Sequence, residues 1–251
     1  IMNKLILNFK SKDSKKIKDP KNFLGGKGAN LSEMGRMGLP VPPGFTISTK
    51  VCEIFYKDKK KLNSKLISQI KKEIKTIEKD VSKKFGDLKN PLLLSVRSGA
   101  RVSMPGMMDT ILNLGLNDKT VVALANKTSN GRFAKDSYRR FIQMYGNVVM
   151  GVESYNFEEL IENYKLTKGV LLDTDLDEED WDGLINDFKN VVKEKTSKDF
   201  PQDVYHQLFG AISAVFLSWE SKRAKVYRKL NQIPSEWGTA VNVQSMVFGN
   251  M

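Results

Sequence analysis

The chain has 251 residues, of which 40% are hydrophobic, so it can bury a substantial core and does not have the composition of a disordered protein. Its single cysteine, Cys52, excludes a disulfide framework, and its apolar runs are too short to span a membrane as a helix. A cytoplasmic protein without membrane association is therefore expected.

The formal net charge of +12 makes a basic nucleic-acid-binding module one alternative. Such a module needs arginines and aromatic residues clustered on one face, and only eight of the 41 basic residues are arginines. Many lysines lie between residues 57 and 84, where Leu66, Ile70, Ile74 and Ile77 recur at helical spacing. The lysines fall mostly off this apolar stripe, which favours a solvated helix face.

In chain order, residues 1–10 predict a short strand and residues 11–21 a polar connector. A glycine-rich turn at residues 25–28 precedes a short helix that ends near Gly38. After a proline-rich extended segment, residues 57–85 predict one long helix that stops at Gly86.

The second half of the chain alternates between strand and helix patterns. The pattern predicts a buried strand over 91–97, a loop over 98–110, a strand over 111–116, helices over about 119–200 and 204–231, and a strand over 239–248. The expected fold is α/β (α+β), with residues 1–116 and 203–251 in one sheet-containing lobe and residues 117–202 in a helical insertion.

The segment Gly25-Gly26-Lys27-Gly28 is the first candidate for a ligand site. Glycines leave backbone amides free to face an anion at a helix start, and Lys27 adds a positive charge. The segment lacks the spacing of a P-loop. A tight turn with an exposed lysine has the same pattern, so both interpretations stay open.

Arg97 and Arg101 form the second candidate, in a loop rich in serine, glycine and methionine. Arg97 ends an apolar strand, and an unpaired buried guanidinium is costly, so it needs a partner. Two arginines can hold phosphate oxygens in a bidentate manner. A structural ion pair to an Asp or Glu explains Arg97 equally well.

The strand over 239–248 is a third candidate, because its polar side, with Gln244 and Met246, could lie against a purine edge. An ordinary amphipathic strand has the same pattern. His206, the only histidine, is expected at a surface or capping position. Four acidic residues could in principle bind Mg²⁺, although no spacing among them is diagnostic: Asp109, Asp118, Asp173 and Asp175.

Several of these segments together resemble the nucleotide-binding domain of the dikinases, the group of pyruvate phosphate dikinases and phosphoenolpyruvate synthases. The resemblance begins at residues 23–34 and 38–45. Residues 95–101 and 103–115 are similar to the pyruvate phosphate dikinase branch, whereas the synthase branch tends to have Arg-Ser-Ser-Ala and Ala-Ser-Phe-Ala-Gly. Further matches cover residues 132–134, 136–145 and 237–244.

The resemblance implies an ATP-grasp-like domain whose two lobes close on ATP and Mg²⁺. It places Lys27 and Arg97 on the ATP phosphates and Gln244 and Met246 at the adenine. It also implies that a loop covers the phosphates, with Arg101, Ser103, Gly106, Met108, Asp109 and Thr110 as its contributing residues.

The implied reaction interconverts ATP, phosphate and pyruvate with AMP, diphosphate and phosphoenolpyruvate in a full-length enzyme that is expected to be a homodimer. In the family, the second lobe with the Mg²⁺ ligands, the phosphohistidine domain and the pyruvate-binding barrel come after the position of Met251. His206 does not lie in the phosphohistidine motif, so no catalytic or metal-binding residue is expected in this chain, which alone is expected to be inactive. Two different functions stay open beside this one: that of a phosphoenolpyruvate synthase-like dikinase and that of a non-catalytic regulatory relative.

Overall fold

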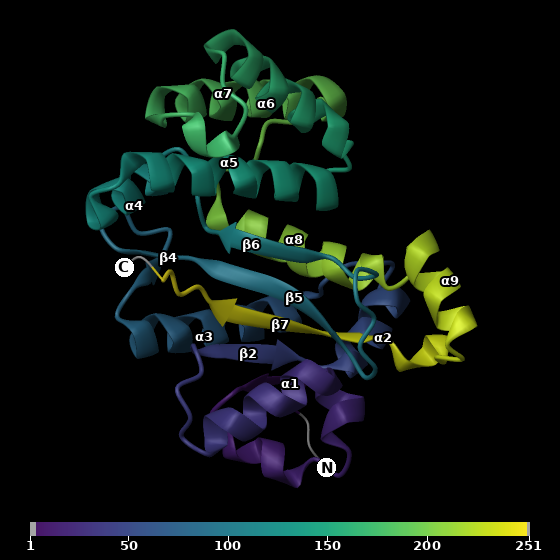
Figure 1. Ribbon diagram of the computed structural model, residues 1–251. Coiled ribbons are helices and arrows are strands. Elements are labelled where there is room, and N and C mark those ends of the chain that lie inside the picture. The colour runs from purple at the N-terminus through teal and green to yellow at the C-terminus, as the bar shows by residue number, and fades with distance from the viewer. Residues whose placement is uncertain (1–3, 250–251) are drawn as a thin grey trace. The chain divides into compact units, whose positions relative to one another are not determined.

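The computed structural model describes residues 4–249 (Figure 1). The chain divides into two compact units. Unit 1 comprises Ile1–Ser82, Leu94–Thr110 and Phe209–Val247, and unit 2 comprises Lys83–Leu93, Ile111–Leu208 and Phe248–Met251. The expected division into 1–116 with 203–251 and 117–202 stays a prediction about domains. These units differ from it by placing residues 83–93, 111–116, 203–208 and 248–251 with the helical part.

Unit 1 contains an antiparallel sheet with the strand order β1-β2-β7-β5. Its strands are Ile6–Asn8 (β1), Gly44–Ile47 (β2), Thr239–Ser245 (β7) and Leu94–Ala100 (β5). Leu94 faces Ser245 in the register, so the prediction that these two segments share a sheet is confirmed. The mixed α/β class is also confirmed.

The two faces of this sheet differ in character. Phe45, Val243 and Val96 are register partners, and all three are fully buried. The residues next to these three in their strands are Thr46, Asn242 and Arg97. They are also register partners, and they form a polar row on the opposite face of the sheet. The apolar row belongs to the core, and the polar row faces the glycine-rich segment described below.

The helices of unit 1 begin and end where local caps allow, and three predicted boundaries are wrong. The elements are Lys12–Lys16 (η1), Pro20–Arg36 (α1), Thr49–Lys57 (α2), Ser64–Val81 (α3), Lys222–Leu230 (α9) and Ser235–Trp237 (η3), with Val204–Ser218 (α8) shared between the units. The predicted 57–85 helix is shorter: Lys57 is the last residue of α2, Asn63 caps the start of α3, and Ser82 ends α3 in a left-handed conformation (φ 53°) before Gly86. The predicted 204–231 helix is likewise interrupted, and Ser221 caps the start of α9. The connector over 11–21 contains η1 and the start of α1.

Two predicted strands also have different bounds. The 91–97 segment contains Pro91–Leu92 (β4), which pairs in parallel with Lys84–Phe85 (β3) in unit 2, and β5, which continues to Ala100 in unit 1. The strand predicted over 239–248 ends at Ser245, and the exposed Val247 lies beyond it.

Unit 2 is mainly helical, as the pattern over 119–200 predicts. Besides β3, β4 and most of Thr110–Leu114 (β6), it contains Thr120–Thr128 (α4), Gly131–Val148 (α5), Ser154–Lys168 (α6), Asp173–Asp175 (η2) and Glu178–Thr196 (α7). Phe141, Phe157 and Phe188 are fully buried, and the rings of Phe157 and Phe188 lie 4.9 Å apart.

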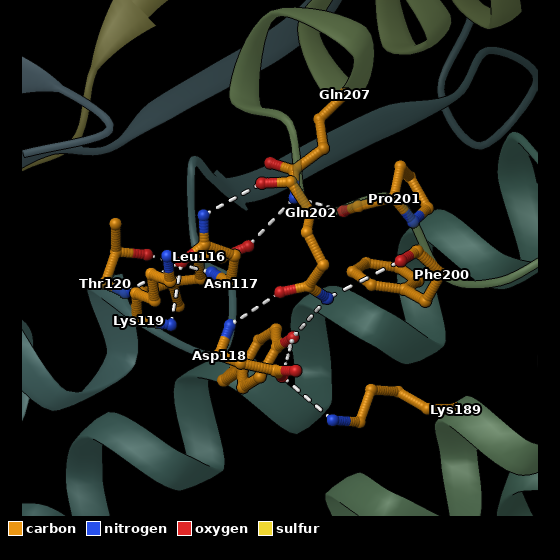
Figure 2. Close-up of polar contacts among 11 residues, drawn as sticks. Leu116, Asn117, Asp118, Lys119, Thr120, Lys189, Phe200, Pro201, Gln202 and Gln207 are labelled. Atoms are coloured by element: carbon orange, nitrogen blue, oxygen red, sulfur yellow. Dashed lines mark hydrogen bonds and ion pairs between the residues drawn. The ribbon is translucent and has the colours of Figure 1, made fainter.

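A hydrogen-bonded cluster joins the start of α4 to the segment that leads into α8 (Figure 2). The fully buried Gln207 accepts a hydrogen bond from the Gly115 N–H and donates to the carbonyls of Leu116 and Pro201. Asp118 accepts from the Tyr138 hydroxyl and from the Lys189 ammonium, each at 2.8 Å. The cluster therefore satisfies buried backbone groups that would otherwise be costly.

Candidate phosphate-binding site

The glycine-rich segment interrupts a helix. The helix α1 begins at Pro20, before the glycines, and its backbone breaks at Gly25, which has φ 70° and ψ 167°. A new helical segment starts directly after this break, so Lys27 lies in its first turn, where backbone N–H groups have no helical acceptor. The turn predicted at residues 25–28 is therefore a kink within a helix.

Close packing against β5 explains the glycine at position 25. A Cβ atom on Gly25 would collide with the carbonyl oxygen of Gly99 and lie 2.5 Å from its carbonyl carbon. Gly26 lies near the same strand end, with its Cβ position 3.5 Å from the Arg101 carbonyl oxygen. The kink thus holds the Lys27 segment directly against the end of β5.

Lys27 and Arg97 lie near one another, although they are distant in sequence. Desolvation and the positive charge of Arg97 lower the pKa of Lys27 below its usual value. Within residues 4–249 neither side chain forms an ion pair, and the buried Arg97 Nε has no hydrogen-bond partner. Two adjacent cations without a carboxylate are typical of a site that receives an anion.

The side chain of Arg101 has other partners. Its guanidinium donates to Asn22 at 3.2 Å, lies 3.6 Å from the Asp19 carboxylate and stacks 4.4 Å from the centre of the Trp237 ring. It lines a depression of about 340 Å³ together with Phe23 and Trp237. The structure therefore places Arg101 in a small ion-paired cluster, and its role on the phosphates stays a prediction.

The predicted phosphate-covering loop packs against α8 and α9. Met104 is buried with Trp219, Ala224 and Ile233, and Met107 and Met108 pack on this cluster. Arg223 forms an ion pair with Asp109 and donates to the Met107 carbonyl at 3.1 Å. Ser103 and Gly106 are exposed, and Thr110 begins β6. The sequence shows several methionines here, and methionines commonly fill cores.

The two adenine candidates, Gln244 and Met246, lie in and just beyond a central strand, and their role at the adenine stays a prediction. The strand β7 is central, so the backbone of Gln244 lies in the ladders with Gly44 and Ser95, and its side-chain amide donates to the Pro42 carbonyl at 3.0 Å. The backbone of Gln244 is therefore not free for a purine edge. Met246 is half-buried beyond the end of the strand.

The acidic candidates for Mg²⁺ have cationic or backbone partners. Asp109 pairs with Arg223, Asp118 with Lys189 and Asp173 with Lys165, whereas Asp175 accepts from the backbone N–H of Leu172. Residues 4–249 contain no group of three His, Cys, Asp or Glu side chains arranged to hold a metal ion. The exposed His206 lies in the first turn of α8, where its backbone N–H donates to the Asp203 carboxylate.

Two polar residues that the sequence interpretation did not select lie in the same row as Arg97. Thr46 and Asn242 are almost completely buried, and the Thr46 hydroxyl donates to Asn242 Oδ1 at 2.7 Å. Each is a polar residue within an otherwise apolar strand, and this pattern could have drawn attention to both. The pattern does not show which strands are neighbours, so it could not have placed them beside Arg97.

None of the helices within residues 4–249 combines the length and apolar character that a membrane crossing requires.

Comparison with known proteins supports a nucleotide site. The family model described as "Pyruvate phosphate dikinase, AMP/ATP-binding domain" matches residues 21–72 and 60–251. Pyruvate, phosphate dikinase of Clostridium symbiosum is 55% identical over 231 residues, which cover 92% of this chain and 26% of that protein. The Rhizobium meliloti (strain 1021) protein of the same name is 51% identical over 250 residues, 100% of this chain and 28% of that protein.

A plant relative gives the same result. The chloroplastic pyruvate, phosphate dikinase of Flaveria pringlei is 53% identical over 248 residues, 99% of this chain and 26% of that protein. The chain thus spans about a quarter of the length of these relatives. The resemblance inferred from the motifs is confirmed, and the chain belongs to the pyruvate phosphate dikinase AMP/ATP-binding domain family.

Proposed function

We propose that this chain binds the phosphates of ATP and supplies one lobe of an ATP-grasp-like site in a pyruvate phosphate dikinase. The full enzyme would convert ATP, phosphate and pyruvate to AMP, diphosphate and phosphoenolpyruvate through a phosphohistidine on another domain. We also propose that the full enzyme uses Mg²⁺, forms a homodimer and is located in the cytoplasm.

The observation that carries the proposal is the adjacency of Lys27 and Arg97 without a carboxylate partner. Burial and, after it, the positive charge of Arg97 disfavour the charged form of Lys27 and lower its pKa. A phosphate anion between the two groups would remove the repulsion and would also satisfy the buried Arg97 Nε. The N–H groups that follow Gly25 add further donors.

These groups act by position and charge. Phosphoryl transfer depends mainly on alignment and on stabilising charge on the phosphate oxygens. In this proposal Arg97, held in a strand, contributes a rigid bidentate donor, and Lys27 contributes a mobile point charge. Bound Mg²⁺ would neutralise phosphate charge, with ligands from outside the described residues.

The test is Arg97→Ala in the full-length enzyme, with the two half-reactions measured separately. The ATP-dependent half-reaction should fall by about 100-fold or more, because one preorganised donor is lost. The pyruvate half-reaction, started from phosphorylated enzyme, should change little because it takes place in another domain.

Arg36→Ala is the matched control, since Arg36 is an arginine of the same unit that bonds Ser14 at 2.7 Å. It should leave both half-reactions unchanged. Equal losses in both half-reactions of Arg97→Ala would show that Arg97 has a structural role, and unaltered ATP chemistry would show that Arg97 does not act on ATP. Either result would contradict the proposal.

A further inference from the structure

A row of three polar residues crosses the centre of the unit 1 sheet. Thr46 of β2 faces Asn242 of β7, and Asn242 faces Arg97 of β5. Register partners in adjacent strands point to the same face, so the three side chains are neighbours. Arg97, one of the two proposed phosphate ligands, is thus the end member of this row.

The first two members hold each other in a closed environment. Thr46 and Asn242 are 0% and 2% exposed, and the hydroxyl of Thr46 donates to Asn242 Oδ1 at 2.7 Å. The other end of the amide, Asn242 Nδ2, is buried without a hydrogen-bond partner within residues 4–249. Such a donor costs stability, and its retention calls for an explanation.

The same two side chains touch both glycine segments of the candidate site. A Cβ atom on Gly28 would lie 2.8 Å from Thr46 Oγ1 and 3.1 Å from Asn242 Oδ1. A Cβ atom on Gly99 would lie 2.6 Å from Asn242 Nδ2. Gly28 is the direct neighbour of Lys27 and Gly99 follows Arg97 by two residues, so the amide lies between the backbone segments that carry the two cations.

We infer that Thr46 and Asn242 are positioning residues, whose mutual hydrogen bond sets the separation of Lys27 and Arg97. The inference rests on the proposed function, in which these two cations bind phosphate. Rotation of the Asn242 amide would press its atoms against Gly28 or Gly99, where the glycines leave no spare volume. The Thr46 hydroxyl prevents this rotation by holding Oδ1, and α1 therefore rests at a fixed height above the sheet.

The inference is tested with Thr46→Val in the 251-residue chain, since valine has nearly the same shape and lacks the hydroxyl. Thr46→Ser is the rescue variant, because it restores the donor. Thr76→Val is the matched control, since the exposed Thr76 makes a local bond to the Lys72 carbonyl within α3. NMR of the Lys27 side chain follows its pKa and its response to inorganic triphosphate, and a melting curve reports stability.

In the unaltered chain, triphosphate should raise the pKa of Lys27, since an anion favours the charged form. Thr46→Val should raise the pKa of free Lys27 toward its usual value, because the amine moves away from Arg97 and becomes more solvated. Triphosphate affinity should fall about tenfold, as expected for the loss of one charge-assisted contact. Thr46→Ser should restore both properties, and Thr76→Val should alter neither.

The outcomes separate the phosphate site from the positioning role. If the unaltered chain shows no response of Lys27 to triphosphate, the proposed phosphate site itself fails. If triphosphate binds the unaltered chain and Thr46→Val binds it equally well, with the same Lys27 pKa in the folded protein, the positioning role is wrong. If Thr46→Val then lowers only the melting temperature, the Thr46–Asn242 hydrogen bond contributes to stability and does not position the cations.

Discussion

Replacing Gly25 by alanine tests whether the kink in α1 is required by its contact with β5. The backbone at this position, with φ 70° and ψ 167°, is in a region that is essentially restricted to glycine. The strain of holding alanine there costs about 1–3 kcal/mol. The new Cβ would also overlap the Gly99 carbonyl, a backbone group that cannot turn aside. Forced overlap of this kind costs a further ~1–3 kcal/mol.

Gly38 provides the comparison for this change. It also has a positive φ of 77°, but no atom lies within 4 Å of its Cβ position. Gly38→Ala should therefore lose about 1 kcal/mol from backbone conformation alone. The expected difference between the two alanine variants is about 2 kcal/mol or more, and it should be confined to unit 1.

Amide hydrogen exchange measures this difference by region, since it reports local unfolding free energies. Protection in β5 and β7 of unit 1 should fall by a factor of about 30 or more in Gly25→Ala relative to Gly38→Ala, because 2 kcal/mol corresponds to that ratio. Protection in α5 and α7 of unit 2 serves as the internal reference. Equal protection of β5 in both variants would refute the argument that close packing against Gly99 requires glycine at position 25.

Three further predictions concern buried or ion-paired groups. Gln207→Leu should destabilise unit 2 by about 2–4 kcal/mol in urea denaturation, because the N–H of Gly115 and two carbonyls lose their partner; an unchanged midpoint would contradict this. Hydrogen bonding to Lys168 lowers the pKa of Asp177 to about 2, so its stabilising contribution should be present above pH 3.8 and lost as the pH falls through about 2. A carboxyl NMR titration should show a higher pKa for Asp177 in Lys168→Met, and an unchanged low value would assign the whole shift to the backbone N–H groups of the helix start. Burial raises the pKa of Cys52 to about 11, so its thiol should react with a disulfide reagent at pH 8 only after unfolding.

Local features of this protein could be predicted from its residues alone. Helical spacing predicted the amphipathic helices between residues 119 and 200, and alternation predicted that segments around 94–97 and 239–245 are strands. The pairing of glycine and lysine at 25–28 and the charge of Arg97 at a strand end made an anion site one of the open interpretations before any contact was known. These features depend on residues that are close in the chain, and periodicity and turn chemistry report such features directly.

Which of these local features meet became clear only from the folded arrangement. The charge of Arg101 and its motif did not show that Asp19 and Trp237 are its neighbours. Alternation in 239–248 did not show that β7 is a central strand, with Gln244 in register with Gly44 on one side and with Ser95 on the other. The burial of Asn242 between two glycine segments depends on three strands and a helix that are far apart in sequence. Strand order and helix seating arise from packing between distant segments, and a single sequence carries no local pattern for such packing.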